Sequence, residues 1–196
     1  MKVSEMLCGS LPTLSFMTKD IVFDVPLVDQ RRDTEDSTWK EKACGVCATK
    51  MMMAFAVPAC IDISVMTLIH EALEIDGYIP NIGWKHAALV QLAERHGVAL
   101  TFQKNFFRTP VEKKKGVRIV QQHIRQHKPV IVSVHYGFDP NRGGHLVIVH
   151  GMRSEGRSVS GYYIQDPYPT QRGNNYFVSE EEFLNGWRGG MILFKE

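Results

Sequence analysis

The pattern of hydrophobic residues changes about two thirds of the way along the chain, from a helical character to runs rich in β-branched residues. An apolar run with small residues at its head predicts a helix over residues 44–57, an apolar stripe predicts a second over residues 63–76, and two more helices are predicted over residues 85–96 and 117–127. The first helix is predicted to stop before Pro58, and the second to have Asp62 as its N-cap, Leu73 on its apolar stripe and Gly77 at its end. A long polar loop, residues 29–42, leads into the first helix.

The later part of the chain is rich in β-branched residues and predicts a sheet. Its strands are predicted over residues 130–136, 145–152, 158–166 and 191–195, with a short helix at 179–184. Two more strands are predicted earlier, at residues 21–28 and 98–103, and Pro26 confines the first of them to an edge or an end of a sheet. Helices followed by antiparallel strands predict an α+β fold.

The length and patterning predict one domain over residues 1–196. A chain of this length can bury one full hydrophobic core, and no repeat, low-complexity tract or linker divides it. We expect an N-terminal extension over residues 1–24, a mostly helical lobe over residues 25–128 and a mostly β lobe over residues 129–196.

Charge and composition narrow the classes of function. The net charge is +2, from 23 basic and 21 acidic residues, so nothing indicates a nucleic-acid or membrane partner. The basic run Lys113-Lys114-Lys115 is best explained as a solvated loop or the start of a helix. No apolar run has the length of a membrane span or a signal peptide, and four cysteines are too few for a disulfide framework. As the chain stands, we expect a cytoplasmic protein.

Cys44 is the first candidate for a chemical role. It falls at the predicted start of a helix, where unpaired N–H groups and the positive end of the helix dipole favour a thiolate. A thiolate is the nucleophilic form of cysteine. A buried structural cysteine is the competing interpretation of this position.

His145 and Asp166 are a candidate pair. If the hairpin between their strands turns midway between Glu155 and Gly156, the two residues are direct cross-strand neighbours on one face. The carboxylate could then orient the imidazole and stabilise its protonated form. A β-bulge would change this register.

Several segments resemble one family. Gln30, Cys44-Gly45 followed by Met51, residues 144–151 and Asp166-Pro167 are similar to the bacteriocin-processing (double-glycine leader) peptidases and their stand-alone relatives among the papain-like cysteine peptidases. The resemblance implies a helical lobe packed on a sheet lobe. It makes Cys44 the nucleophile, His145 the general base, Asp166 the orienting acid, and Gln30 a donor of the oxyanion hole beside the Cys44 backbone N–H.

The sequence departs from this pattern next to the cysteine. Val46 and Cys47 stand where the family usually has proline and a small residue, and Cys-Gly-Val-Cys also resembles a papain segment in which the second cysteine attacks. Cys47 is therefore a competing nucleophile. The spacing to Met51, and Ala48 in place of an aromatic residue, favour Cys44.

The activity implied is thiol-dependent hydrolysis of a peptide or amide bond, with a peptide or protein as partner and with no metal or organic cofactor. Three alternatives remain open: transglutaminase-like or acyltransferase chemistry with the same triad, a catalytically inactive peptide-binding domain, and metal or redox chemistry at Cys44-x-x-Cys47. A zinc site would need a second pair of ligands, for which the sequence offers no matching motif.

Overall fold

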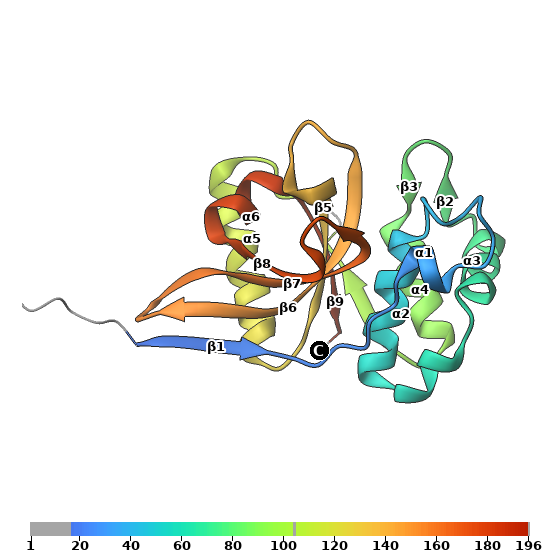
Figure 1. The fold of residues 1–196 in the computed structure, drawn as a ribbon, viewed down its shortest axis with the longest axis horizontal. Helices are drawn as coiled ribbons and strands as arrows, with labels where there is room; N and C mark the ends of the chain where they lie inside the picture. Colours follow the sequence, from blue (N-terminus) through green and yellow to red (C-terminus); the bar gives the residue numbers. More distant parts are fainter. Residues whose placement is uncertain (1–16, 104, 196) are drawn as a thin grey trace, which may run out of the picture.

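A computed structural model describes residues 17–103 and 105–195, and these form the two lobes seen in Figure 1. The fold is α+β, as the residue pattern predicts. The helical lobe holds α1 (Gln30–Asp33), α2 (Cys44–Ala56), a 3₁₀ turn (Pro58–Asp62), α3 (Val65–Glu74), β2 (Tyr78–Ile79), β3 (Gly83–Trp84) and α4 (His86–Arg95). No helix in these two ranges is both long and apolar enough to span a membrane.

The other lobe is built on an antiparallel sheet to which the described residues contribute seven strands. The strands are β1 (Thr18–Val22), β4 (Leu100–Phe102), β5 (Val130–His135), β6 (Gly144–Glu155), β7 (Ser158–Thr170), β8 (Gly173–Ser179) and β9 (Trp187–Phe194). Their order is β4-β9-β5-β6-β7-β8, and β1 pairs with the far end of β6. The remaining elements are α5 (Pro110–Arg125), a 3₁₀ turn (Tyr136–Phe138) and α6 (Glu180–Gly186).

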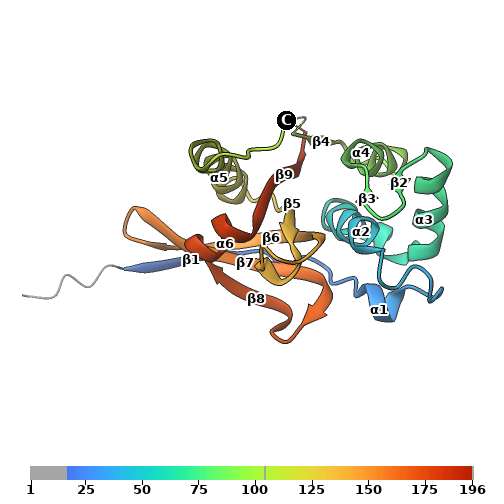
Figure 2. The same cartoon turned by 90° about the horizontal axis from the view of Figure 1, so that it is seen from above.

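Both faces of the central strands are buried, which explains their almost continuous apolar sequence. On β5, Ile131 faces the core shared with α2, α3 and α4, whereas Val130 and Val132 face the core shared with α5 and α6. On β6, Leu146 and Val147 divide in the same way. Figure 2 shows α2 and α5 on opposite sides of β5 and β9. The helical lobe is therefore attached to the sheet mainly through α2.

The helix bounds differ from the prediction where a cap was misassigned. The helix predicted from residue 63 begins at Val65, because the Ser64 side chain accepts the Thr67 N–H and caps it. Asp62 ends the preceding 3₁₀ turn instead. The prediction that Leu73 lies on the buried stripe is wrong, since it is 39% exposed.

The helix predicted over residues 117–127 starts a full two turns earlier, at Pro110. Thr109 and Glu112 form a reciprocal capping box, in which each side chain accepts a backbone N–H of the other residue. The lysine run lies in these first turns. Their mostly exposed side chains carry no apolar spacing, so the pattern only became visible from Val117.

The strand predicted over residues 21–28 and the loop predicted over 29–42 also need correction. Strand β1 ends at Val22, and Pro26 has no N–H with which to extend the sheet. The Val25 carbonyl instead accepts the Gln165 side-chain amide, 2.6 Å away. Within the polar segment, Asp29 caps the short helix α1, which the sequence pattern missed.

Candidate active site

Cys44 is the first residue of α2, as the sequence predicts, and its position is fixed by Trp84. The indole N–H of Trp84 donates to the Lys42 carbonyl at 2.6 Å. Its ring lies against Gly45, where an added Cβ would come within 2.8 Å of Cδ1. Only glycine allows this close approach, so Gly45 and Trp84 together hold the first turn of α2 in place.

His145 and Asp166 are in contact, although not in the predicted register. The imidazole Nε2 lies 2.6 Å from Asp166 Oδ1, and both side chains are buried. The prediction that they oppose each other directly is wrong, because β6 pairs Ile148 with Gln165 and the hairpin has bulges. Continued to the start of β6, this register sets His145 opposite Tyr168. Asp166, two residues away, remains on the same face and within side-chain reach.

The Asp166 carboxylate is held by two further donors. The backbone N–H of Tyr168 donates to Oδ1 at 2.9 Å, and the Tyr176 hydroxyl donates to Oδ2 at 2.8 Å. The Asp166 side chain is fully buried, so these groups take the place of water. Tyr176 is a site residue that sequence reasoning missed, because it lies on β8, a strand that was not predicted.

The thiol of Cys44 and the imidazole of His145 stabilise each other's charged forms. Burial alone would raise the pKa of the Cys44 thiol, but the hydrogen bond and charge of His145 outweigh it and hold the pKa below its usual value. Burial disfavours the imidazolium, but the charge and hydrogen bond of Asp166, together with Cys44, raise the pKa of His145 to about 10. Since Nε2 contacts Asp166, the other ring nitrogen is the one left to face the thiol.

Gln30 lies near Cys44 and His145. It begins α1, its side chain is only 1% exposed, and its Nε2 donates to the Lys40 carbonyl at 2.6 Å. The amide nitrogen carries a second N–H, which this contact leaves free. Its Oε1 is buried and finds no partner among residues 17–103 and 105–195. Gln30, Cys44 and His145 line one cavity of about 300 Å³.

Cys47 occupies a different environment from Cys44. It is fully buried in the core between α2 and its neighbours, and burial raises the pKa of its thiol far above the usual value. Such a thiol is protonated and sheltered at neutral pH. In the part of the chain that the structure describes, no three His, Cys, Asp or Glu side chains gather as a metal site would require.

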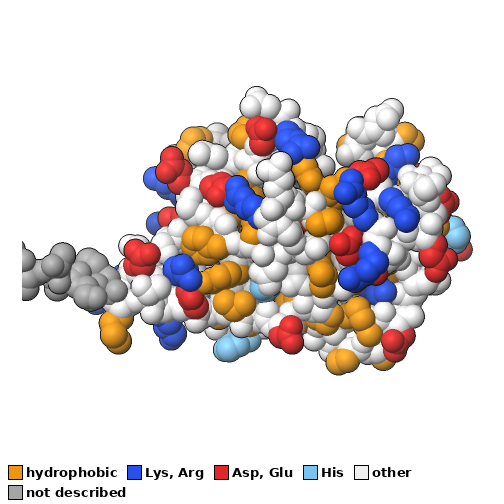
Figure 3. All heavy atoms as spheres, viewed as in Figure 1, with side chains coloured by type: hydrophobic (Ala, Val, Ile, Leu, Met, Phe, Trp, Pro, Cys, Tyr) orange, Lys and Arg blue, Asp and Glu red, His pale blue; other side chains and the backbone are white. Residues whose placement is uncertain are grey.

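A second cavity, of about 480 Å³, is also lined by Cys44 and His145. It extends toward the helical lobe, where Trp84 and His86 line it, and to Phe106 in the segment between β4 and α5. The space-filling view shows the surface indented between the lobes (Figure 3). Cys44 and His145 thus line two cavities, of which only the first includes Gln30.

A helical lobe that presents a cysteine at a helix start, packed on an antiparallel sheet that carries histidine, is the fold of the papain-like cysteine peptidases. Residues 22–189 match the model of the Peptidase_C39 like family, and the chain belongs to this family. No curated protein sequence matches the chain.

Three solved structures illustrate the likeness in fold. A C39-like peptidase from Bacillus anthracis superposes with a TM-score of 0.63 at 18% identity, covering 91% of this chain and 98% of that one. The peptidase domain of Streptococcus ComA, a bifunctional ABC transporter, gives 0.54 at 18% identity, with 88% and 97% covered. A double-glycine motif protease from an AMS/PCAT transporter, in complex with its leader peptide, gives 0.51 at 16% identity, with 89% and 93% covered.

Proposed function

We propose that the protein hydrolyses a peptide or amide bond, with Cys44 as nucleophile, His145 as general base and acid, and Asp166 as the group that orients His145. The observation that carries the proposal is the row of thiol, imidazole and carboxylate, in which His145 and Asp166 are buried, the Cys44 pKa is lowered and the His145 pKa is raised. An ion pair of thiolate and imidazolium is the reactive state of such a site.

In the acylation step, the Cys44 thiolate attacks the carbonyl carbon of the substrate and forms a tetrahedral intermediate. The Gln30 side-chain N–H and the Cys44 backbone N–H donate to its oxyanion. The carbon–nitrogen bond then breaks, and His145 gives its proton to the departing amine. The product of this step is a thioester on Cys44.

In the deacylation step, neutral His145 takes a proton from water, and the resulting hydroxide attacks the thioester carbonyl. The carbon–sulfur bond breaks, the acid product leaves, and the thiolate–imidazolium pair is restored. Asp166 keeps its charge throughout and stabilises the imidazolium whenever it forms.

The decisive experiment compares covalent labelling of the wild type, Cys44→Ala and Cys47→Ala by iodoacetamide and by peptidyl electrophiles. We expect Cys44→Ala to abolish labelling and Cys47→Ala to retain it, because only the first thiol is activated and faces a cavity. Labelling that follows Cys47 would reverse the assignment. The two residues share one tryptic peptide, so fragment masses must locate the label.

A peptide-library cleavage profile then tests hydrolysis itself. Cleavage by the wild type, absent in Cys44→Ala, supports the proposal. Products in which an added amine replaces water would indicate transglutaminase-like or acyltransferase chemistry. Peptide binding without any conversion would indicate an inactive peptide-binding member of the family.

A further inference from the structure

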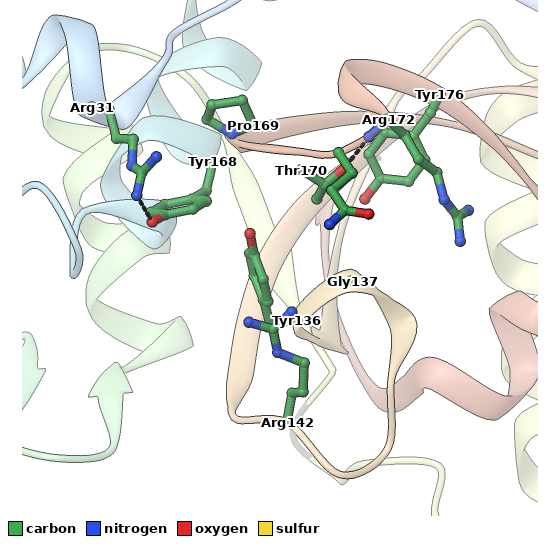
Figure 4. Close-up of a pocket in the computed structure, with 10 residues that line it drawn as sticks. Arg31, Tyr136, Gly137, Arg142, Tyr168, Pro169, Thr170, Arg172 and Tyr176 are labelled. Carbon is green, nitrogen blue, oxygen red and sulfur yellow. Dashed lines mark hydrogen bonds between the residues drawn. The ribbon is translucent and has the colours of Figure 1, made fainter.

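A third cavity, of about 500 Å³, lies beside the candidate active site and is lined by arginine and tyrosine. Arg31 comes from α1, Arg142 from the segment between β5 and β6, and Arg172 from the turn between β7 and β8. No Asp or Glu lines it in the described ranges. Three segments far apart in sequence thus bring cationic side chains to one space (Figure 4).

Each of these guanidinium groups rests on an aromatic ring. The Arg142 guanidinium carbon lies 4.1 Å from the centre of the Tyr136 ring, and that of Arg31 lies 4.2 Å from the centre of the Tyr168 ring. Arg172 lies over Tyr176 at 5.5 Å. Stacking of this kind orients a guanidinium and leaves N–H groups at its edge for acceptors. Arg31 donates one of them to the Tyr168 hydroxyl, and Arg172 donates one to Glu182.

The surrounding carboxylates do not neutralise the cavity. Arg172 pairs with Glu182 at 2.6 Å, whereas Arg31 and Glu41 are 3.5 Å apart and both are more than half exposed, which makes their attraction weak. Arg142 has no carboxylate partner within 4.0 Å among the residues that the structure describes. The cavity therefore keeps at least one uncompensated positive charge, at Arg142.

The cavity shares part of its lining with the site of the proposed chemistry. Tyr136, Arg142 and Tyr168 also line the cavity that holds Gln30, Cys44 and His145. The Tyr136 ring stands edge-on to the His145 ring, with 5.4 Å between their centres. A substrate chain that is bound at Cys44 and extends past Gln30 would run beside these two tyrosines toward the arginines. Each residue of an extended chain spans about 3.3–3.6 Å, so we expect a few residues to cover this path.

We propose that this cavity binds a carboxylate of the substrate, so that the protein prefers chains with an acidic group on the Gln30 side of the scissile bond. This inference rests on the proposed function. The acidic group is either a Glu or Asp side chain or the free C-terminal carboxylate, because arginine recognises both with the same paired N–H groups.

The test uses iodoacetyl peptides of about one to four residues, a length matched to the reach above. One series ends in glutamate amide, a second in glutamine amide, and a third in glutamine with a free carboxylate. We expect one acidic series to alkylate Cys44 at least fivefold faster than glutamine amide at some length. Arg142→Gln should bring that ratio near one. Arg157→Gln, which removes an exposed arginine of the β6–β7 turn, should preserve it.

The series that reacts faster identifies the source of the carboxylate. Ratios near one at every length in the wild type, or ratios that survive Arg142→Gln, would overturn the proposal. A binding measurement tests the proposed carboxylate site even if the protein does not hydrolyse peptides. Dye-labelled glutamate and glutamine peptides are titrated against Cys44→Ala by fluorescence anisotropy, which needs no reaction. Preference for the acidic peptide that Arg142→Gln removes supports the proposal, and equal binding overturns it.

Discussion

The hydroxyl of Tyr176 donates a hydrogen bond to Asp166 Oδ2, the carboxylate oxygen that does not contact His145. Burial, and after it the charge of nearby Asp166, raises the Tyr176 pKa far above its usual value. The phenol therefore stays protonated, and can donate this bond, at neutral and moderately alkaline pH. Asp166 can rotate only by giving up this bond. Tyr176 thus acts on the imidazole indirectly, as a positioning residue.

Replacing Tyr176 with phenylalanine should lower kcat/KM by roughly tenfold and the free energy of unfolding by about 1–2 kcal/mol. The loss follows from a buried carboxylate oxygen that is left without a donor. Without this donor the Asp166 carboxylate interacts more strongly with the imidazolium and raises the His145 pKa. The alkaline limb of the pH–rate profile should therefore move to higher pH. Steady-state kinetics over pH and thermal unfolding measure these effects.

Tyr163→Phe is the matched control for that variant. The Tyr163 hydroxyl also donates to a carboxylate, Asp20 Oδ2, at 2.8 Å, but this pair lies where β7 and β1 flank the outer part of β6. The Tyr163→Phe variant should therefore leave kcat/KM and the pH profile unchanged. If both variants lose activity equally, or if Tyr176→Phe alters stability alone, the positioning role is wrong.

The sequence predicted the architecture well where one periodicity dominated. The Cys44 helix and the helix over residues 85–96 were predicted to within about a residue. An apolar run that stops before a proline marked the first, and a following glycine marked the end of the second. Strand β8 was missed, since its residues alternate only weakly and no turn signal was recognised before it. Caps at Ser64 and Thr109 showed that short polar contacts decide where a helix begins.

The contact between His145 and Asp166 was predicted from an incorrect register. It was nevertheless found, because a slip of two residues keeps both side chains on one face of the sheet. The burial of Gln30 could not be predicted from its polar neighbours in sequence. It accompanies a hydrogen bond to the Lys40 carbonyl, ten residues further along the chain. Tyr176 and the arginine cavity arise from segments that meet only in three dimensions. The catalytic roles of Cys44, His145, Asp166 and Gln30 remain predictions.

Hydrolysis and alkylation should respond differently to alkaline pH. Both need the Cys44 thiolate, whose pKa is lowered, so both should already proceed below the pH at which an ordinary thiol ionises. Hydrolysis also needs a proton on His145 for the leaving amine, and that proton is lost as the pH passes about 10. We therefore expect kcat/KM to fall there while the rate of iodoacetamide alkylation does not.

Rates of peptide cleavage and of alkylation, measured on one preparation from about pH 4 to about pH 11, provide this comparison. Near-ultraviolet circular dichroism at each pH tests whether the fold persists. Parallel loss of both activities with an intact spectrum would contradict the assignment of His145 as the proton donor.

Gln30→Glu separates stabilisation of the oxyanion from reactivity of the thiol. The substitution keeps the shape of the side chain but replaces its N–H donor with an acceptor that repels a developing oxyanion. Loss of one such donor typically costs about 3–4 kcal/mol, so we expect kcat/KM to fall by roughly a hundredfold or more. Alkylation by iodoacetamide attacks a saturated carbon and forms no oxyanion, so its rate should change far less. Gln122→Glu, at an exposed position on the distant helix α5, controls for the added charge. Equal losses of cleavage and alkylation in Gln30→Glu would show that the residue supports the thiolate or the fold, and not the oxyanion.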